Sequence, residues 1–211
     1  MRIINPSFEF ADEINAEQML DKIEKAYRIC YMSEPNGNRN AFIANKIKIG
    51  HESPLEHASV SVIITTNRGV THELVRHRIA SYSQSSTRYC NFSKDKFGNE
   101  ITVIRPCYFA EDTENYRIWK ASCEAAENAY FAMLDNDATP QEARSVLPNS
   151  LKTEICMTAN LREWRHFFKL RALGITGKPH PQMLEVTVPL LAEFKALIPV
   201  VFDDLIVGEN L

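Results

Sequence analysis

The chain has 211 residues, of which 45% are hydrophobic, and a formal net charge of -3. This length and apolar content suit one sizeable core, so we predict a single domain over residues 1–211. The slight acidity argues against nucleic-acid and membrane-surface binding, which normally need a basic face. The five cysteines are odd in number and form no Cys-x-x-Cys pair, so neither a disulfide framework nor a zinc site is indicated.

The N-terminal part is predicted to be scaffold. Residues 1–6 lack the apolar run of a signal peptide, and no apolar stretch reaches membrane-spanning length, so a soluble cytoplasmic protein is expected. A short strand is expected at residues 2–4. Apolar residues at helical spacing predict an amphipathic helix at 15–31, and Asn40 is expected to cap a second helix that ends at Gly50.

The segment that starts at Ser53 has the pattern of a capping box, with proline next and Glu56 three residues on. The amides and dipole of a helix start favour negative charge, which makes Ser53 a candidate for anion binding. His51 and His57 flank this start but are separated by six positions and a proline, unlike the zinc-protease spacing. Hydrogen bonding or packing explains them better than metal binding, and we predict no metal site.

Alternating apolar residues predict a strand at 60–66, followed by a turn at 67–69. Thr71 is expected to cap a short helix that leads into Arg76-His77-Arg78. If that helix continues, its two arginines lie roughly 200° apart around the axis. They would then meet two ligands, or two parts of one large ligand.

Residues 76–88 gather three arginines, one histidine and several hydroxyls on an otherwise acidic chain. A guanidinium binds phosphate or carboxylate with two parallel hydrogen bonds, and hydroxyl and amide groups complete the set of phosphate donors. Residues 82–88 are therefore predicted to form a loop that cradles phosphate. A nucleophilic role for Ser86 with His77 as base ranks lower, because no Gly-x-Ser-x-Gly elbow surrounds the serine.

The second half of the chain continues as alternating strands and helices. Turn chemistry at residues 139–142 starts a helix that leads to Arg144. Periodicity predicts four more elements: strands at 101–104 and 153–159, a long helix at 112–134, and a helix at 183–197 interrupted by Pro189. The aromatic stripe of the long helix predicts core packing. Together these elements predict an α+β fold, with helices packed around a central, mostly antiparallel sheet.

Asn160 is a suitable N-cap for a helix at residues 161–171. Arg162 and His166 share one face of that helix, whereas Arg171 lies about 180° from Arg162. The helix thus presents cations on two sides. No Gly-x-Gly-x-x-Gly after a strand and no P-loop pattern occurs, so neither of those phosphate-binding folds accounts for the anion-binding residues.

Residues 76–88 resemble the signature of the flavin-dependent thymidylate synthases. Arg-His-Arg is followed after seven residues by Ser86, with Ser81 and Arg88 in register. The resemblance extends over nearly the whole chain, because other ligand-binding segments of the family are matched in the same order at residues 50–57, 144–149 and 160–182.

The resemblance implies reductive methylation of dUMP to dTMP, with 5,10-methylenetetrahydrofolate as carbon donor and FAD, reduced by NADPH, as hydride carrier. It also implies a homotetramer whose active sites lie between subunits. Because the cofactor carries the hydride, the protein has to orient ligands and tune charge, which suits a site of Arg, His, Ser and Asn. No cysteine has the paired base that a conventional thymidylate synthase would need.

The resemblance also implies roles for individual residues. Flavin contacts would come from Ser53, Arg76, His77, Arg78, Gln84, Asn160, Arg162 and His166. Nucleotide contacts would come from Glu73, Arg76, Gln84, Ser86, Arg88, Arg144 and Arg171. Arg171 would be the catalytic residue, placed at the uracil ring to promote ionisation of N3. The link at 173–179 looks longer than in the family, so His180 and Gln182 stay outside the assigned set.

Three alternatives stay open. Glu73 either accepts a hydrogen bond from a uracil or ribose donor or forms an intrahelical pair with His77. The chain as a whole could be a nucleotide- or RNA-binding module that stacks bases on Tyr82 and Tyr89. It could also be a flavoprotein methyltransferase that acts on another nucleotide.

Overall fold

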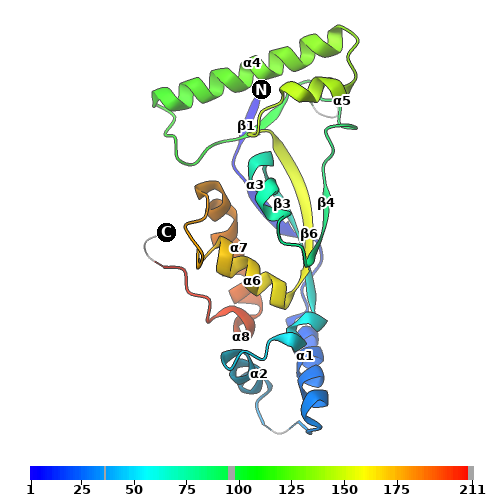
Figure 1. The fold of residues 1–211 in the computed structure, drawn as a ribbon, viewed down its shortest axis with the longest axis vertical. Coiled ribbons are helices and arrows are strands. Elements are labelled where there is room, and N and C mark those ends of the chain that lie inside the picture. The colour runs from blue at the N-terminus through cyan, green and yellow to red at the C-terminus, as the bar shows by residue number, and fades with distance from the viewer. Residues whose placement is uncertain (36, 95–97, 209–211) are drawn as a thin grey trace. The chain divides into compact units, whose positions relative to one another are not determined.

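The computed structural model describes residues 1–35, 37–94 and 98–208 (Figure 1). The backbone contacts group the chain into two compact units. Unit 1 comprises Met1–Ser7, Ile64–Arg76 and Ser83–Ile155, and unit 2 comprises Phe8–Ile63, His77–Tyr82 and Cys156–Leu211. The single domain expected from the composition stays a prediction.

Two long strands, β3 (Ser59–Asn67) and β6 (Lys152–Asn160), run through both units as neighbours in a sheet. Among the described residues the strand order is β2-β3-β6-β4, where β2 is Ser7–Phe10 and β4 is Ala80–Gln84. In unit 2 the Leu161 amide donates to the carbonyl of Ala58, and in unit 1 the Arg68 amide donates to that of Leu151. Residue numbers thus rise along β3 as they fall along β6. These strands are antiparallel, and the predicted α+β fold is confirmed.

Unit 1 contains a smaller sheet in which β1 (Arg2–Ile4) pairs in parallel with β5 (Thr102–Ile104). Its core includes Ile101, Val103, Cys123 and Leu151. Cys123 comes from α4 (Glu114–Asp135), drawn in green in Figure 1, which is the long helix predicted from the sequence. Unit 1 also holds α3 (Arg68–Leu74), α5 (Pro140–Ala143) and the 3-10 helix η3 (Arg144–Val146).

Unit 2 is built mainly of helices. They are α1 (Ala16–Tyr31), α2 (Arg39–Lys48), the 3-10 helix η1 (Ser53–His57), α6 (Leu161–Arg171), α7 (Pro181–Leu197) and α8 (Pro199–Phe202). Their core is an aromatic cluster of fully buried side chains: Trp164, Phe167, Phe168, Phe194 and Phe202. Each such side chain stabilises the fold by about 1.5–3 kcal/mol relative to an exposed one. The cluster therefore holds α6 firmly in place.

Two predicted helix caps are wrong. Asn38 rather than Asn40 caps α2, because its Oδ1 accepts from the Ala41 amide at 3.1 Å. Asn67 rather than Thr71 caps α3, so a helix begins where a turn was expected, and Thr71 lies within it. In both cases an asparagine a few residues earlier, a strong N-cap type, meets the helix amides first.

The predicted capping box at Ser53 is also wrong. Glu52 occupies the cap position of η1 and makes no side-chain capping bond, and η1 is a five-residue 3-10 helix. Such a short helix has little dipole, which removes the physical argument for an anion site there.

The predicted interruption at Pro189 does not occur, because α7 continues through it. Leu190, Leu191 and Phe194 are buried just beyond the proline, and their packing outweighs the hydrogen bond that proline removes. None of the helices within residues 1–35, 37–94 and 98–208 combines the length and the apolar character needed to cross a membrane.

Candidate active site

The Arg-His-Arg segment is not helical. Helix α3 ends at Leu74, because the amides of Val75 and Arg76 turn back to the carbonyls of Thr71 and Glu73. Arg76 and Arg78 are exposed, whereas His77 between them is buried. Because α3 ends before them, the separation of roughly 200° expected for a continuing helix does not apply to the two arginines. His77 likewise lies outside α3, so a pair of Glu73 with His77 would not be intrahelical.

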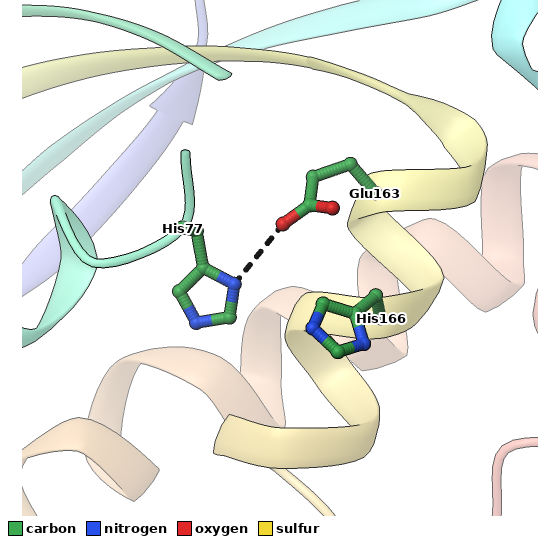
Figure 2. Close-up of side chains that lie close together, drawn as sticks. All are labelled: His77, Glu163 and His166. Carbon is green, nitrogen blue, oxygen red and sulfur yellow. Dashed lines mark hydrogen bonds and ion pairs between the residues drawn. The ribbon is translucent and has the colours of Figure 1, made fainter. Parts of the chain in front are cut away.

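His77 is the buried centre of a hydrogen-bonded chain in unit 2. Its Nδ1 lies 3.1 Å from Oε1 of Glu163, and its Nε2 accepts from Nε of Arg171 at 3.2 Å. Figure 2 shows Glu163 projecting from α6 toward the imidazole. Burial, with smaller effects of Arg171 and His166, lowers the pKa of His77 to about 4. The imidazole is therefore neutral at neutral pH.

Glu163 was not predicted as a site residue. In the structure only 6% of its surface is exposed, and it contacts His77 directly. Asn160 caps α6 as predicted, since its Oδ1 accepts from the Glu163 amide at 2.9 Å. A glutamate three residues after an N-cap was a visible signal, but one that normally indicates a capping box. Burial raises the pKa of the Glu163 carboxyl.

The side chains of His77, Glu163 and His166 have the composition of a metal site, with ligand atoms within 4.8 Å of one another (Figure 2). However, Nδ1 of His77 faces Glu163, and its Nε2 receives a hydrogen bond from the permanently charged Arg171. A metal ion on Nε2 would have to displace this guanidinium. The geometry is that of a hydrogen-bonded chain, and we assign no metal to it.

Helix α6 was predicted to present Arg171 on the face opposite Arg162 and His166, but Arg171 and His166 meet at one place. The rings of His166 and His77 meet edge to face, with centroids 5.8 Å apart, so His166 and Arg171 both adjoin the same imidazole. Although Arg171 starts about 180° from Arg162 around the axis of α6, its long side chain at the last turn reaches His77. Arg162 is half-exposed and pairs with Glu56 at 2.6 Å, and its helix packs against η1, where Ser53 is exposed.

The start of α7 holds the two residues that were left outside the assigned set. His180 is its N-cap, and its Nδ1 accepts from the Gln182 amide at 3.2 Å. Gln182 is buried in the first turn. Both residues thus take part in the local structure of the helix start.

Unit 1 gathers a second group of predicted site residues. Gln84 belongs to β4, not to a loop as predicted, and its Nε2 donates to the hydroxyls of Thr71 and Thr153. The loop begins after this strand. There the Arg88 amide donates to Oγ of Ser86 at 3.3 Å.

Two predicted phosphate contacts approach this loop. Nε of Arg88 donates to Gln141 at 3.3 Å, and Nη1 of Arg144 donates to Oγ1 of Thr87 at 3.3 Å. The helix start predicted at residues 139–142, just before Arg144, is confirmed, and the structure shows a capping box of Thr139 and Glu142 there. Both of these bonds go to neutral partners.

A cavity of about 370 Å³ in unit 1 opens beside this loop and is lined by Ser85, Ser86 and Thr87. Arg2, Arg68 and Lys152 add positive charge, and Glu100 and Glu154 add negative charge. Nη1 of Arg68 is buried and has no hydrogen-bond partner among the described residues. Arg68 was predicted to lie in a turn and was not a predicted site residue. Only the cavity that it lines together with Ser86 indicates a role in ligand binding.

The fold and these residues define an α+β protein with cationic, hydroxyl-rich groups suited to anionic ligands. The sequence profile of the family described as "Thymidylate synthase complementing protein" matches residues 14–200. The chain belongs to this family, which confirms the resemblance found in the sequence.

Two flavin-dependent thymidylate synthases illustrate the relationship. The one from Geobacter sulfurreducens is 34% identical over 85% of this chain and 78% of its own length. The one from Mycolicibacterium gilvum is also 34% identical, over 94% and 84% respectively. A crystal structure of the UMP/dUMP methylase PolB from Streptomyces cacaoi, bound with 5-Br dUMP, has the same fold. Its TM-score is 0.80 at 21% identity, over 96% of both chains.

Proposed function

We propose that the protein methylates dUMP reductively to dTMP, with 5,10-methylenetetrahydrofolate as carbon donor and FAD, reduced by NADPH, as hydride carrier. Family membership and the names of the relatives support thymidylate formation and flavin dependence. The structural observation that carries the proposal is the cavity beside Ser86, where hydroxyls and cations of unit 1 meet. We assign no residue to folate or NADPH.

The cavity suits the phosphate of the nucleotide, because Ser86 lines it. Its volume of about 370 Å³ lies within the range of small-molecule sites. Ser86 with Arg88 and Arg144 would bind the phosphate through charge-assisted hydrogen bonds. Glu73, Arg76 and Gln84 would contact the ribose and base. Arg68 adds a guanidinium whose buried Nη1 needs an acceptor.

The proposed flavin contacts are Ser53, Arg76, His77, Arg78, Gln84, Asn160, Arg162 and His166. The exposed cations Arg78 and Arg162 fit the diphosphate of FAD, and the exposed ring of His166 offers a planar surface for a flavin. Bound FAD would supply the hydride. The chain's own groups would hold and orient it.

Arg171 would act on the uracil. A guanidinium next to N3 stabilises the anion formed when N3 loses its proton and so lowers the pKa of that group. The contact of its Nε with His77 aligns the guanidinium plane. This side chain would therefore provide the electrostatic contribution to the reaction.

We further propose a homotetramer with active sites between subunits. In support, two large apolar side chains are uncovered in the single chain: Ile79, directly after the Arg-His-Arg segment, is 69% exposed, and Tyr89, directly after Arg88, is 79% exposed. Light scattering with size-exclusion chromatography would give the mass, and a monomer at micromolar concentration would contradict this part. The cytoplasmic location stays a prediction.

The decisive test is a visible spectrum of the purified protein, followed by anaerobic reduction with NADPH and addition of the two substrates. Flavin bands that reoxidise only with dUMP and methylenetetrahydrofolate together, with dTMP formed, would establish the reaction. Parallel reactions with UMP separate it from methylation of another nucleotide. A protein that stays colourless after incubation with FAD but binds RNA would instead support the nucleic-acid alternative.

A further inference from the structure

Three side chains of unit 2 form a continuous chain, Glu163–His77–Arg171. The two bonds measure 3.1 and 3.2 Å, and both Glu163 and His77 are almost fully buried, at 6% and 5% exposure. Arg171 at the end of the chain is half-buried. Two hydrogen bonds thus link the buried carboxylate to Arg171, the residue proposed to act on the substrate.

The chain allows only one protonation pattern of His77. The Nε–H of Arg171 can only donate, so Nε2 of the imidazole must accept and carries no proton. A neutral imidazole then carries its proton on Nδ1, which donates to Oε1 of Glu163. The pKa of His77, lowered to about 4, agrees with the neutral form.

Glu163 supplies the acceptor that selects this tautomer. Within the described residues, the Tyr82 hydroxyl instead donates to the backbone carbonyl of His77, and the rings of His166 and Phe167 meet the imidazole edge to face, with centroids 5.8 and 5.0 Å away. Without the carboxylate, the proton on Nδ1 would lose its buried acceptor, so the preference for this tautomer over a proton on Nε2 would weaken. A proton on Nε2 would oppose the Nε–H of Arg171, since two donors cannot share a bond.

We propose that Glu163 is a positioning residue that acts through His77. By holding the Nδ1–H tautomer, it keeps Nε2 as acceptor and so fixes the plane and direction of the Arg171 guanidinium. The role of that guanidinium in turnover rests on the proposed function, but the tautomer does not. A donor that is already oriented needs little reorganisation in the transition state, so we expect the loss of Glu163 to lower kcat.

The test compares E163L, which removes the acceptor, with E163Q, whose amide oxygen restores it without charge. E193L, at an exposed position of α7, controls for loss of a helix carboxylate. We expect kcat to fall about 10- to 100-fold in E163L with KM for dUMP within about 3-fold, and E163Q to recover most of kcat. E163L with wild-type kcat would overturn the proposal, and so would an E163Q as impaired as E163L.

Nitrogen-15 NMR of the His77 ring gives a readout that needs no turnover. The wild type and E163Q should show protonated Nδ1 and bare Nε2, and E163L a mixture of tautomers. A wild-type ring protonated on Nε2, or on both nitrogens at neutral pH, would refute the chain even if E163L fails to fold. If the protein makes no dTMP, the same spectra still decide the tautomer, so the two proposals fail separately.

Discussion

The two units hold their predicted site residues in different ways. In unit 1, Arg88 and Arg144 bond to Gln141 and Thr87, which are neutral partners beside a loop. In unit 2, His77 is locked between a buried carboxylate and Arg171. Arg88 and Arg144 can readily exchange their neutral partners for a phosphate. The hydrogen-bonded chain of Glu163, His77 and Arg171 already orients its groups before any ligand binds. We therefore expect changes in unit 1 to affect substrate binding and changes in unit 2 to affect turnover.

The largest effect should come from R171A. Removing this guanidinium takes away stabilisation of the N3 anion, so kcat should fall about 100- to 1,000-fold. R171K keeps the charge but lacks the Nε–H that meets His77, and should recover only part of the rate. Steady-state kinetics measure both variants. R171A with kcat within about 3-fold of wild type would remove the catalytic role from unit 2.

R144A tests the binding role of unit 1. Loss of a charge-assisted phosphate contact should raise KM for dUMP about 10- to 100-fold with little change in kcat. R117A is the matched control, because Arg117 is an exposed arginine on α4 that pairs with Glu114. A decrease in kcat at unchanged KM would contradict the proposed division between the units.

The lowered pKa of His77 predicts a dependence of stability on pH. Between pH 6.5 and about 4 the unfolded chain binds a proton that folded His77 does not. His77 therefore leaves the free energy of unfolding independent of pH above 6.5, and lowers it by about 3 kcal/mol as the pH falls from 6.5 to 4.

Among the residues that the structure describes, the titratable or charged groups that face the ring are Glu163, Arg171 and His166. NMR titration of His77 gives its pKa directly. Denaturant unfolding of wild type and H77F at several pH values compares how steeply the unfolding free energy of each protein depends on pH. The pKa of Glu163 is raised, which acts in the opposite sense, so the difference between the two proteins is the relevant quantity. An imidazole that titrates near 6.5 would show that the locked chain is absent.

R68M should separate binding from stability in unit 1. The variant removes a buried nitrogen that has no hydrogen-bond partner among the described residues, so unfolding free energy should stay constant or rise by up to about 1 kcal/mol. KM for dUMP should rise about 3- to 10-fold if Arg68 meets the nucleotide. Unchanged KM would restrict the phosphate site to Ser86, Arg88 and Arg144.

The smallest effect is expected from E56Q, which weakens the half-exposed pair with Arg162. Such surface pairs contribute about 0–1 kcal/mol, so the melting temperature should change little. Because Arg162 would then be available to an anion, affinity for FAD should rise slightly, by about 2- to 3-fold. Fluorescence titration of the apoprotein measures this, and weaker FAD binding would indicate that Glu56 orients Arg162 for the cofactor.

The sequence by itself determined the features that depend on neighbouring residues. The helix at 161–171 and its Asn160 cap were predicted correctly because periodicity and capping are local interactions. The same holds for the helix start at Thr139 and for the spaced signature that indicated the family. Resemblance, rather than residue chemistry, assigned roles to the individual arginines.

Only the tertiary structure decided which groups meet. Residues 80–84 form a strand because a partner strand of the sheet satisfies their backbone, although their many hydroxyls favoured a loop. Glu163 and His77 are 86 positions apart, and no local pattern relates them. The carboxylate reaches the imidazole because the buried aromatic cluster holds α6 in place, and that packing combines side chains from three helices.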